Sequence, residues 1–112
     1  MRIGKRMKEN AAIVDVAGEL DLHSSQELRS VMLDAIRQQV APRLILNLKG
    51  VSYIDSSGVS VLVEGLKASG GGKGKFALCG LGPEVRDVLK LTQLLPVFEV
   101  YENEDDCLRA GS

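Results

Sequence analysis

The spacing of apolar residues changes at residue 55, and this change constrains the fold more than any other feature of the sequence. Residues 43–48 form a short run rich in branched apolar side chains, which is typical of a buried strand. After the break, apolar residues recur at helical spacing: Val59, Leu62, Val63 and Leu66. The break itself reads Asp55-Ser56-Ser57-Gly58, and helix N-termini use acids, hydroxyls and glycine. The sequence therefore predicts a strand that ends here and a helix that begins.

The same alternation of strand and helix runs through the first half of the chain. Residues 12–18 predict a strand, and the stripe that follows predicts an amphipathic helix: Leu28, Val31, Met32, Ala35 and Ile36. Ser24 with Glu27 is typical of a capping box at the start of that helix. Because strands alternate with helices, neighbouring strands should be parallel and joined by right-handed crossovers.

The two ends of the chain complete this pattern. Residues 3–8 should pair antiparallel with residues 12–18 through the polar turn at 9–10. The second half predicts a series of further elements: a glycine-rich helix stop and flexible connection at 69–74, a strand at 75–79, a helix opened by Gly82-Pro83, an edge strand at 94–101 and a last helical turn at 105–110. We predict one α/β domain over residues 1–112, with a mixed, mostly parallel sheet of four to five strands and about four helices.

Composition excludes several classes of function. The chain has 112 residues and a net charge of −1, so it lacks the basic field that proteins use to bind nucleic acids. No segment approaches the roughly 18 continuous apolar residues that span a bilayer, and no signal-peptide core follows the first residues. We therefore expect a cytoplasmic protein without membrane insertion. Cys79 and Cys107 have neither metal-binding nor disulfide spacing, so we expect free buried thiols.

The residues do not favour an enzyme. His23 is the one histidine, so it would have to serve any Ser-His-Asp arrangement, and no GxSxG elbow surrounds Ser56. One histidine and two distant cysteines do not make a metal-ligand set. The glycine-rich segments match neither the P-loop nor the dinucleotide-binding pattern, so we expect no cofactor.

Two interpretations of the segment from Asp55 to Gly58 remain open on the residues alone. In the first, Asp55 or Ser56 is simply a helix cap. In the second, the segment is a functional site, because α/β proteins place their sites at the carboxyl ends of strands, where helix amides stabilise a phosphate.

Three segments together resemble a known family. Gly18-Glu19-Leu20-Asp21, residues 44–69 and residues 74–108 resemble, in order and spacing, the STAS-domain anti-sigma factor antagonists of bacteria. The resemblance covers about residues 12–108. It implies a regulatory binding protein that is a phosphorylation substrate and not a catalyst.

The resemblance also implies roles for individual residues. Ser56, directly after the acid, is the expected phosphorylation site, Ser57 and Gly58 hold the neighbouring motif positions, and Asp21 lies in a loop close by. The unphosphorylated form should bind a serine kinase of the histidine-kinase-like ATPase fold, which is also the anti-sigma factor, and so free the sigma factor. A PP2C-type serine phosphatase should reset the switch. Similar domains also serve as constitutive subunits of lipid-transport ABC systems or as regulatory scaffolds, and this is the alternative function.

We expect the partner surface to combine the 21–25 loop, the 55–58 loop and the outward side of the helix that follows. Its predicted residues are Asp21, His23, Ser24, Asp55, Ser57, Gly58, Ser60, Val61 and Glu64. Gly65 should leave room for close approach of the partner. A phosphate on Ser56 should be repelled by the two nearby aspartates and attracted by the helix amides, with little net effect on the monomer.

Overall fold

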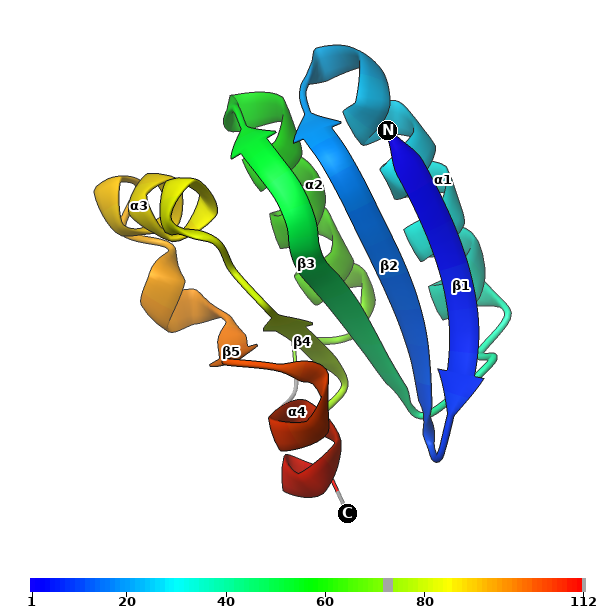
Figure 1. Cartoon of the computed structure of the whole chain (residues 1–112). Helices are drawn as coiled ribbons and strands as arrows, with labels where there is room; N and C mark the ends of the chain where they lie inside the picture. Colours follow the sequence, from blue (N-terminus) through cyan, green and yellow to red (C-terminus); the bar gives the residue numbers. More distant parts are fainter. Residues whose placement is uncertain (72–73, 112) are drawn as a thin grey trace.

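The computed structural model describes residues 1–71 and 74–111 and arranges them as one five-stranded sheet with flanking helices (Figure 1). The strands are β1 (Arg2–Lys8), β2 (Ala11–Leu20), β3 (Arg43–Ile54), β4 (Phe76–Cys79) and β5 (Glu99–Tyr101). The helices are α1 (Leu22–Arg37), α2 (Ser56–Ala68), α3 (Pro83–Leu91) and α4 (Glu104–Ala110), with a short 3-10 helix, η1 (Leu95–Val97).

The strands lie side by side in chain order. β1 is antiparallel to β2, and β2, β3, β4 and β5 are parallel to one another. The turn at 9–10 joins the antiparallel pair, as predicted. This arrangement confirms the predicted α/β class and the mixed, mostly parallel sheet.

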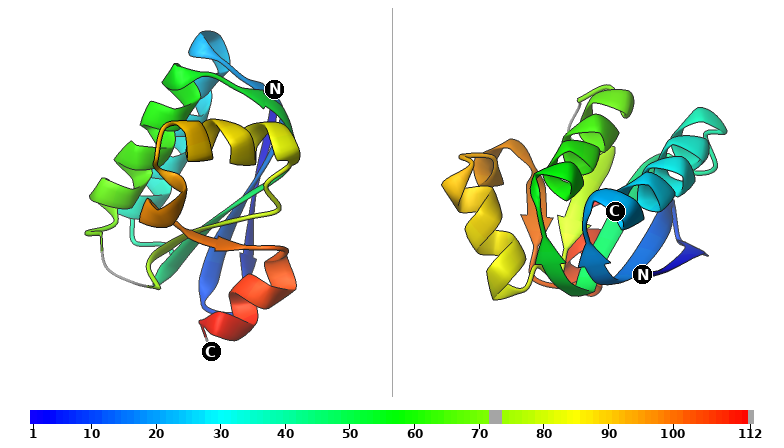
Figure 2. Two further views of the ribbon diagram at one scale, coloured as in Figure 1. Left: turned by 90° about the vertical axis from the view of Figure 1, so that its left-hand side faces the viewer. Right: turned by 90° about the horizontal axis from the view of Figure 1, so that it is seen from above.

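The side chains of β2 show how the two faces of the sheet differ. Ala12, Val14 and Val16 point into the main core, which includes residues of α1, α2 and α3. Ala11 and Ile13 point to the opposite face and pack in a smaller cluster with α4. Figure 2 shows α1 and α2 on one side of the sheet and α4 on the other. A strand covered on both faces carries a continuous apolar run, which explains why residues 11–14 contain no polar side chain.

The two cysteines belong to this smaller cluster. Cys79 of β4 and Cys107 of α4 are both buried and both free, as predicted. Burial raises the pKa of Cys79 to about 12, so its thiol stays protonated at neutral pH.

The predicted capping box of the first helix is wrong. α1 begins three residues earlier than a Ser24 cap requires, because Asp21 is the N-cap and Ser24 is its reciprocal partner in the first turn. Ser24 therefore lies inside the helix, and Glu27 has no capping role.

The predicted edge strand at 94–101 is shorter than expected. Residues 95–97 form η1 instead, and only Glu99–Tyr101 pairs with β4. Pro96 lies in η1, and proline has no N–H to donate to a strand ladder. Within the glycine-rich connection, α2 ends at Ala68 as predicted, while residues 72–73 lie outside the part of the chain that the structure describes.

The outward assignment of Val61 is also wrong, and so is the role given to Gly65. Val61 is 4% exposed and belongs to the main core. A Cβ on Gly65 would lie 2.4 Å from Met32 Sδ of α1 and 2.7 Å from the Phe76 ring of β4. α2 packs against both the sheet and α1, so it buries a wider arc than a single apolar stripe, and Gly65 permits contact within the protein instead of contact with a partner.

This burial gives a direct test. Val61→Ala should lower the free energy of unfolding by about 2 kcal/mol, because the buried methyl groups are removed and a cavity remains. Ser60→Ala on the exposed side should change it by less than about 0.5 kcal/mol. Urea denaturation of both variants measures the difference, and equal stabilities would contradict the packing of α2.

Candidate functional site

Two helices begin side by side where β2 and β3 end. Leu20 and Ile54, the last residues of these strands, are partners in the parallel register, and the Asp55 amide donates to the Leu20 carbonyl at 3.2 Å. An aspartate follows each strand and caps the next helix, and Asp21 and Asp55 have nearly the same backbone conformation. Figure 1 shows both helix starts at one end of the sheet. The 21–25 and 55–58 segments are therefore brought together, as the sequence predicts.

Asp21 is held by a compact set of hydrogen bonds. Its Oδ1 accepts from the His23 and Ser24 amides, each at 3.0 Å, and lies 3.1 Å from Ser24 Oγ. Ser24 Oγ accepts from the Asp21 amide and donates to the Glu19 carbonyl at 2.6 Å. The backbone and side-chain hydrogen bonds from Ser24 lower the pKa of Asp21, so its carboxylate stays ionised at neutral pH.

Asp55 fixes the first turn of α2. Its Oδ1 accepts from the Ser57 amide at 2.9 Å and from the Gly58 amide at 3.2 Å. A Cβ on Gly58 would lie 2.7 Å from Ile54 Cγ1 and 2.9 Å from the Leu20 carbonyl oxygen. Glycine at this position thus lets the first turn of α2 pack directly against both strand ends. A side chain here would clash, which explains the glycine in the motif.

Ser56 is the exposed residue of this turn. It is the first residue of α2, its side chain is exposed, and its hydroxyl has no partner among the described residues. Ser57 is half-buried. An unbonded hydroxyl that projects from a fixed backbone is available to a reagent or partner from solution.

The surroundings of Ser56 are acidic. The segments 18–25 and 55–60 contain Glu19, Asp21 and Asp55 and no lysine or arginine. No group of three or more histidine, cysteine or acidic side chains that could hold a metal ion occurs in residues 1–71 and 74–111.

The remaining predicted partner residues lie differently. His23 and Ser60 are exposed, as expected. Glu64 is half-buried and forms a bidentate pair with Arg29 of α1 at 2.8 Å, which lowers the pKa of Glu64 and joins the two helices. Val61 is buried and does not belong to the surface.

One exposed residue at this end was not predicted. Leu22, the first residue of α1, is 62% exposed and adds apolar surface beside Asp21. The available signal was its position between Asp21 and His23, where the apolar stripe of the helix has not yet begun.

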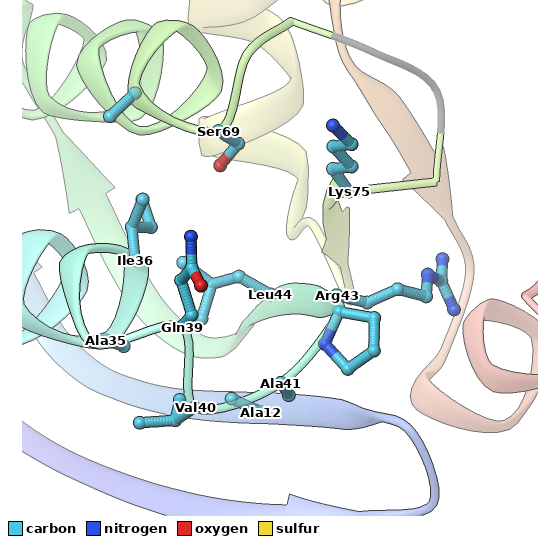
Figure 3. A pocket seen from close by; sticks show the side chains of 12 residues that line it. Ala12, Ala35, Ile36, Gln39, Val40, Ala41, Arg43, Leu44, Ser69 and Lys75 are labelled. Carbon is cyan, nitrogen blue, oxygen red and sulfur yellow. The ribbon is translucent and has the colours of Figure 1, made fainter.

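A hollow elsewhere on the domain does not involve the candidate site. A hollow of about 510 Å³ lies at the opposite end of the sheet, between the C-terminal ends of α1 and α2 (Figure 3). Ile36, Leu44, Ser69 and Lys75 are among its lining residues, and none of the predicted site residues lines it. This hollow is therefore separate from the candidate site.

Comparison with known proteins agrees with this arrangement. A family model described as the STAS domain matches residues 2–107. The chain belongs to the STAS domain family. It is 33% identical over 96 residues to an anti-sigma F factor antagonist of Paenibacillus polymyxa, which covers 86% of this chain and 82% of that protein. It is 32% identical over 92 residues to an anti-sigma-B factor antagonist of Staphylococcus aureus, which covers 82% and 84%. These relatives are named as regulators and not as enzymes.

Solved STAS structures share the fold. The anti-sigma factor antagonist SpoIIAA in its unphosphorylated form aligns with a TM-score of 0.79 at 25% identity, over 97% of this chain and 96% of that one. An anti-sigma factor antagonist from Mycobacterium paratuberculosis aligns with a TM-score of 0.88 at 25% identity, over 97% and 92%. In the described residues of this STAS domain, no helix is long and apolar enough to cross a membrane.

The cap geometry predicts a stability effect at Asp55. Asp55→Ala should lower the free energy of unfolding by about 1 kcal/mol, because the Ser57 and Gly58 amides lose their acceptor. Asp55→Asn keeps an acceptor oxygen and should stay close to the parent. Urea denaturation provides the measurement, and Asp87→Ala on the exposed side of α3 is the matched control. A cost for the asparagine variant equal to that for alanine would show that the cap is not what stabilises this turn.

Proposed function

We propose that this STAS domain is an anti-sigma factor antagonist whose partner binding is switched by phosphorylation of Ser56. The unphosphorylated form binds a serine kinase of the histidine-kinase-like ATPase fold that is also the anti-sigma factor, and the sigma factor is thereby released. A PP2C-type phosphatase removes the phosphate and restores binding. The observation that carries this proposal is the exposed, unbonded hydroxyl of Ser56 on a backbone fixed by Asp55.

The relatives support the same class of function. The curated relatives of Paenibacillus polymyxa and Staphylococcus aureus are both named as antagonists of anti-sigma factors. The matching SpoIIAA structure is that of the unphosphorylated form, so SpoIIAA is a protein that can be phosphorylated. The exposed position of Ser56 at the corresponding end of the same fold is compatible with such a state here.

The first turn of α2 has little capacity to hold a phosphate. The Ser57 and Gly58 amides already donate to Asp55 Oδ1, and the Val59 amide donates to the Asp55 carbonyl at 3.0 Å. Asp55 therefore occupies the Ser57, Gly58 and Val59 amides, which leaves only the Ser56 amide of the first turn for a phosphate. Such a phosphate remains in solvent, where it adds about −1.5 to −2 charges beside Asp55.

This placement makes the switch a local change of charge. In the free protein the phosphate keeps its water, so the fold need not change. At a closed interface it loses that water, and an unpaired or repelled charge there costs several kcal/mol. Since about 1.4 kcal/mol corresponds to a tenfold change, binding should weaken by roughly a hundredfold or more.

The phosphorylation site is tested by mass spectrometry. Incubation with the cognate kinase and ATP should add one phosphate, because the γ-phosphoryl group passes to Ser56 Oγ as the hydroxyl proton is lost. Ser57→Ala should still be phosphorylated and Ser56→Ala should not. Peptide mapping that finds phosphate only on Ser57 would overturn the assignment. A kinase that binds the protein but never modifies it would favour a constitutive subunit or scaffold.

The switch itself is tested by binding. Ser56→Asp should keep the circular dichroism spectrum of the parent and bind the kinase at least about a hundredfold more weakly. Ser56→Ala should bind normally, which separates the effect of charge from loss of the hydroxyl. Isothermal titration calorimetry gives the affinities. The charge account fails if the phosphoprotein loses binding while Ser56→Asp binds as the parent does.

A further inference from the structure

The outer edge of β1 is open along its whole length. β1 is the first strand of the sheet, and no described strand pairs with its other side. Figure 1 shows β1 at the edge of the sheet. Its pairing with β2 runs without a register shift over seven residues and contains no proline. A long, regular edge of this kind presents unpaired backbone N–H and C=O groups that a further strand can bind.

The charge of β1 is of one sign. The strand carries Arg2, Lys5, Arg6 and Lys8 and no acid. A second copy of β1 would bring like charges together, which is the common protection of an edge strand against its own kind. The same charges attract an acidic strand, so they select between partners and do not simply block the edge.

Part of this charge is already neutralised by acids of the domain. Arg6 bonds Asp15 of β2 at 2.6 Å and Glu104 of α4 at 2.5 Å, and Lys8 reaches Glu104 at 3.5 Å. Arg2 and Lys5 have no partner among the described residues. The uncompensated charge therefore lies in the first half of β1.

The side chains of β1 differ between the two faces of the sheet. The register places Arg2, Gly4, Arg6 and Lys8 on the face of the sheet that carries α4. Ile3, Lys5 and Met7 lie on the face that carries α1, where Ile3 packs against the main core and Met7 is 56% exposed. Because Arg2 and Lys5 lie on opposite faces, an added strand matches this edge if it carries acids three residues apart, one on each face, with apolar residues between them.

We propose that β1 is a docking edge for an extended, acidic segment of another protein, which carries an acid on each of its two faces and binds as a sixth strand. Backbone hydrogen bonds supply the pairing, and Arg2 and Lys5 supply the selection for acids. This surface is separate from Ser56, so the proposal does not depend on the phosphorylation switch.

The test uses the full chain labelled with nitrogen-15 and a blocked seven-residue peptide with glutamate at its first, fourth and seventh positions and valine at the others. Addition of the peptide should shift the amide resonances of residues 2–8 and slow hydrogen exchange at the outward amides of β1. The same peptide with lysine in place of glutamate should have no effect. Added salt should weaken binding, because the selecting charges are exposed.

Charge variants complete the test. The double variant Arg2→Glu/Lys5→Glu should bind the acidic peptide at least about tenfold more weakly. Lys67→Glu/Lys90→Glu changes the net charge equally at exposed positions on α2 and α3, and it should bind as the parent does. Circular dichroism checks that both variants fold.

Several results would overturn the proposal. These are no shift in β1 at millimolar acidic peptide, equal binding of the lysine peptide, or equal loss of affinity in both double variants. Concentration-dependent shifts of β1 in the absence of peptide would also overturn it, because they would identify a second copy of the chain as the occupant.

Discussion

The parallel pairing of β2 with β3 is the constraint on which the rest of the structure depends. It sets Leu20 opposite Ile54, so the two chains leave the sheet at the same level and turn into helices side by side. The pairing reaches this alignment through two register shifts, one of which directly follows Gly18. Gly18 has a φ of +112°, a conformation that side chains other than glycine rarely adopt. The glycine of the Gly18-Glu19-Leu20-Asp21 motif thus helps to align two strand ends that are far apart in sequence.

Two aspartates fix the backbone of the two helix starts that this alignment brings together. Asp21 and Asp55 each accept amides of the turn that follows, and the Asp55 amide is itself bonded to Leu20. The backbone around Ser56 is therefore fixed before any partner arrives, while its hydroxyl stays free. We propose that added charge at Ser56 changes the surface more than the fold, because the Asp55 side chain already accepts from the Ser57 and Gly58 amides. A domain built in this way can act as a switch without a second conformation.

The local parts of this site could be predicted from sequence, and the parts set by packing could not. The break at Asp55 indicates both the strand end and the cap, because a cap is formed within three residues. At α1 both Asp21 and Ser24 are residue types that cap helices, and in the structure Asp21 is the cap and Ser24 its partner. The inward position of Gly65 could not be predicted locally, because it depends on Met32 and Phe76, which come from distant segments. Val61 is likewise buried by the tertiary packing of α2. The pairing of Glu64 with Arg29 could not be predicted for the same reason.

The structure of the protein phosphorylated at Ser56 tests the central claim most directly. The account predicts that the Ser57 and Gly58 amides remain bonded to Asp55 Oδ1, that the phosphate oxygens face solvent, and that α1 and α2 keep their packing. A phosphate that accepts from these two amides, with Asp55 displaced from its capping position, would contradict it.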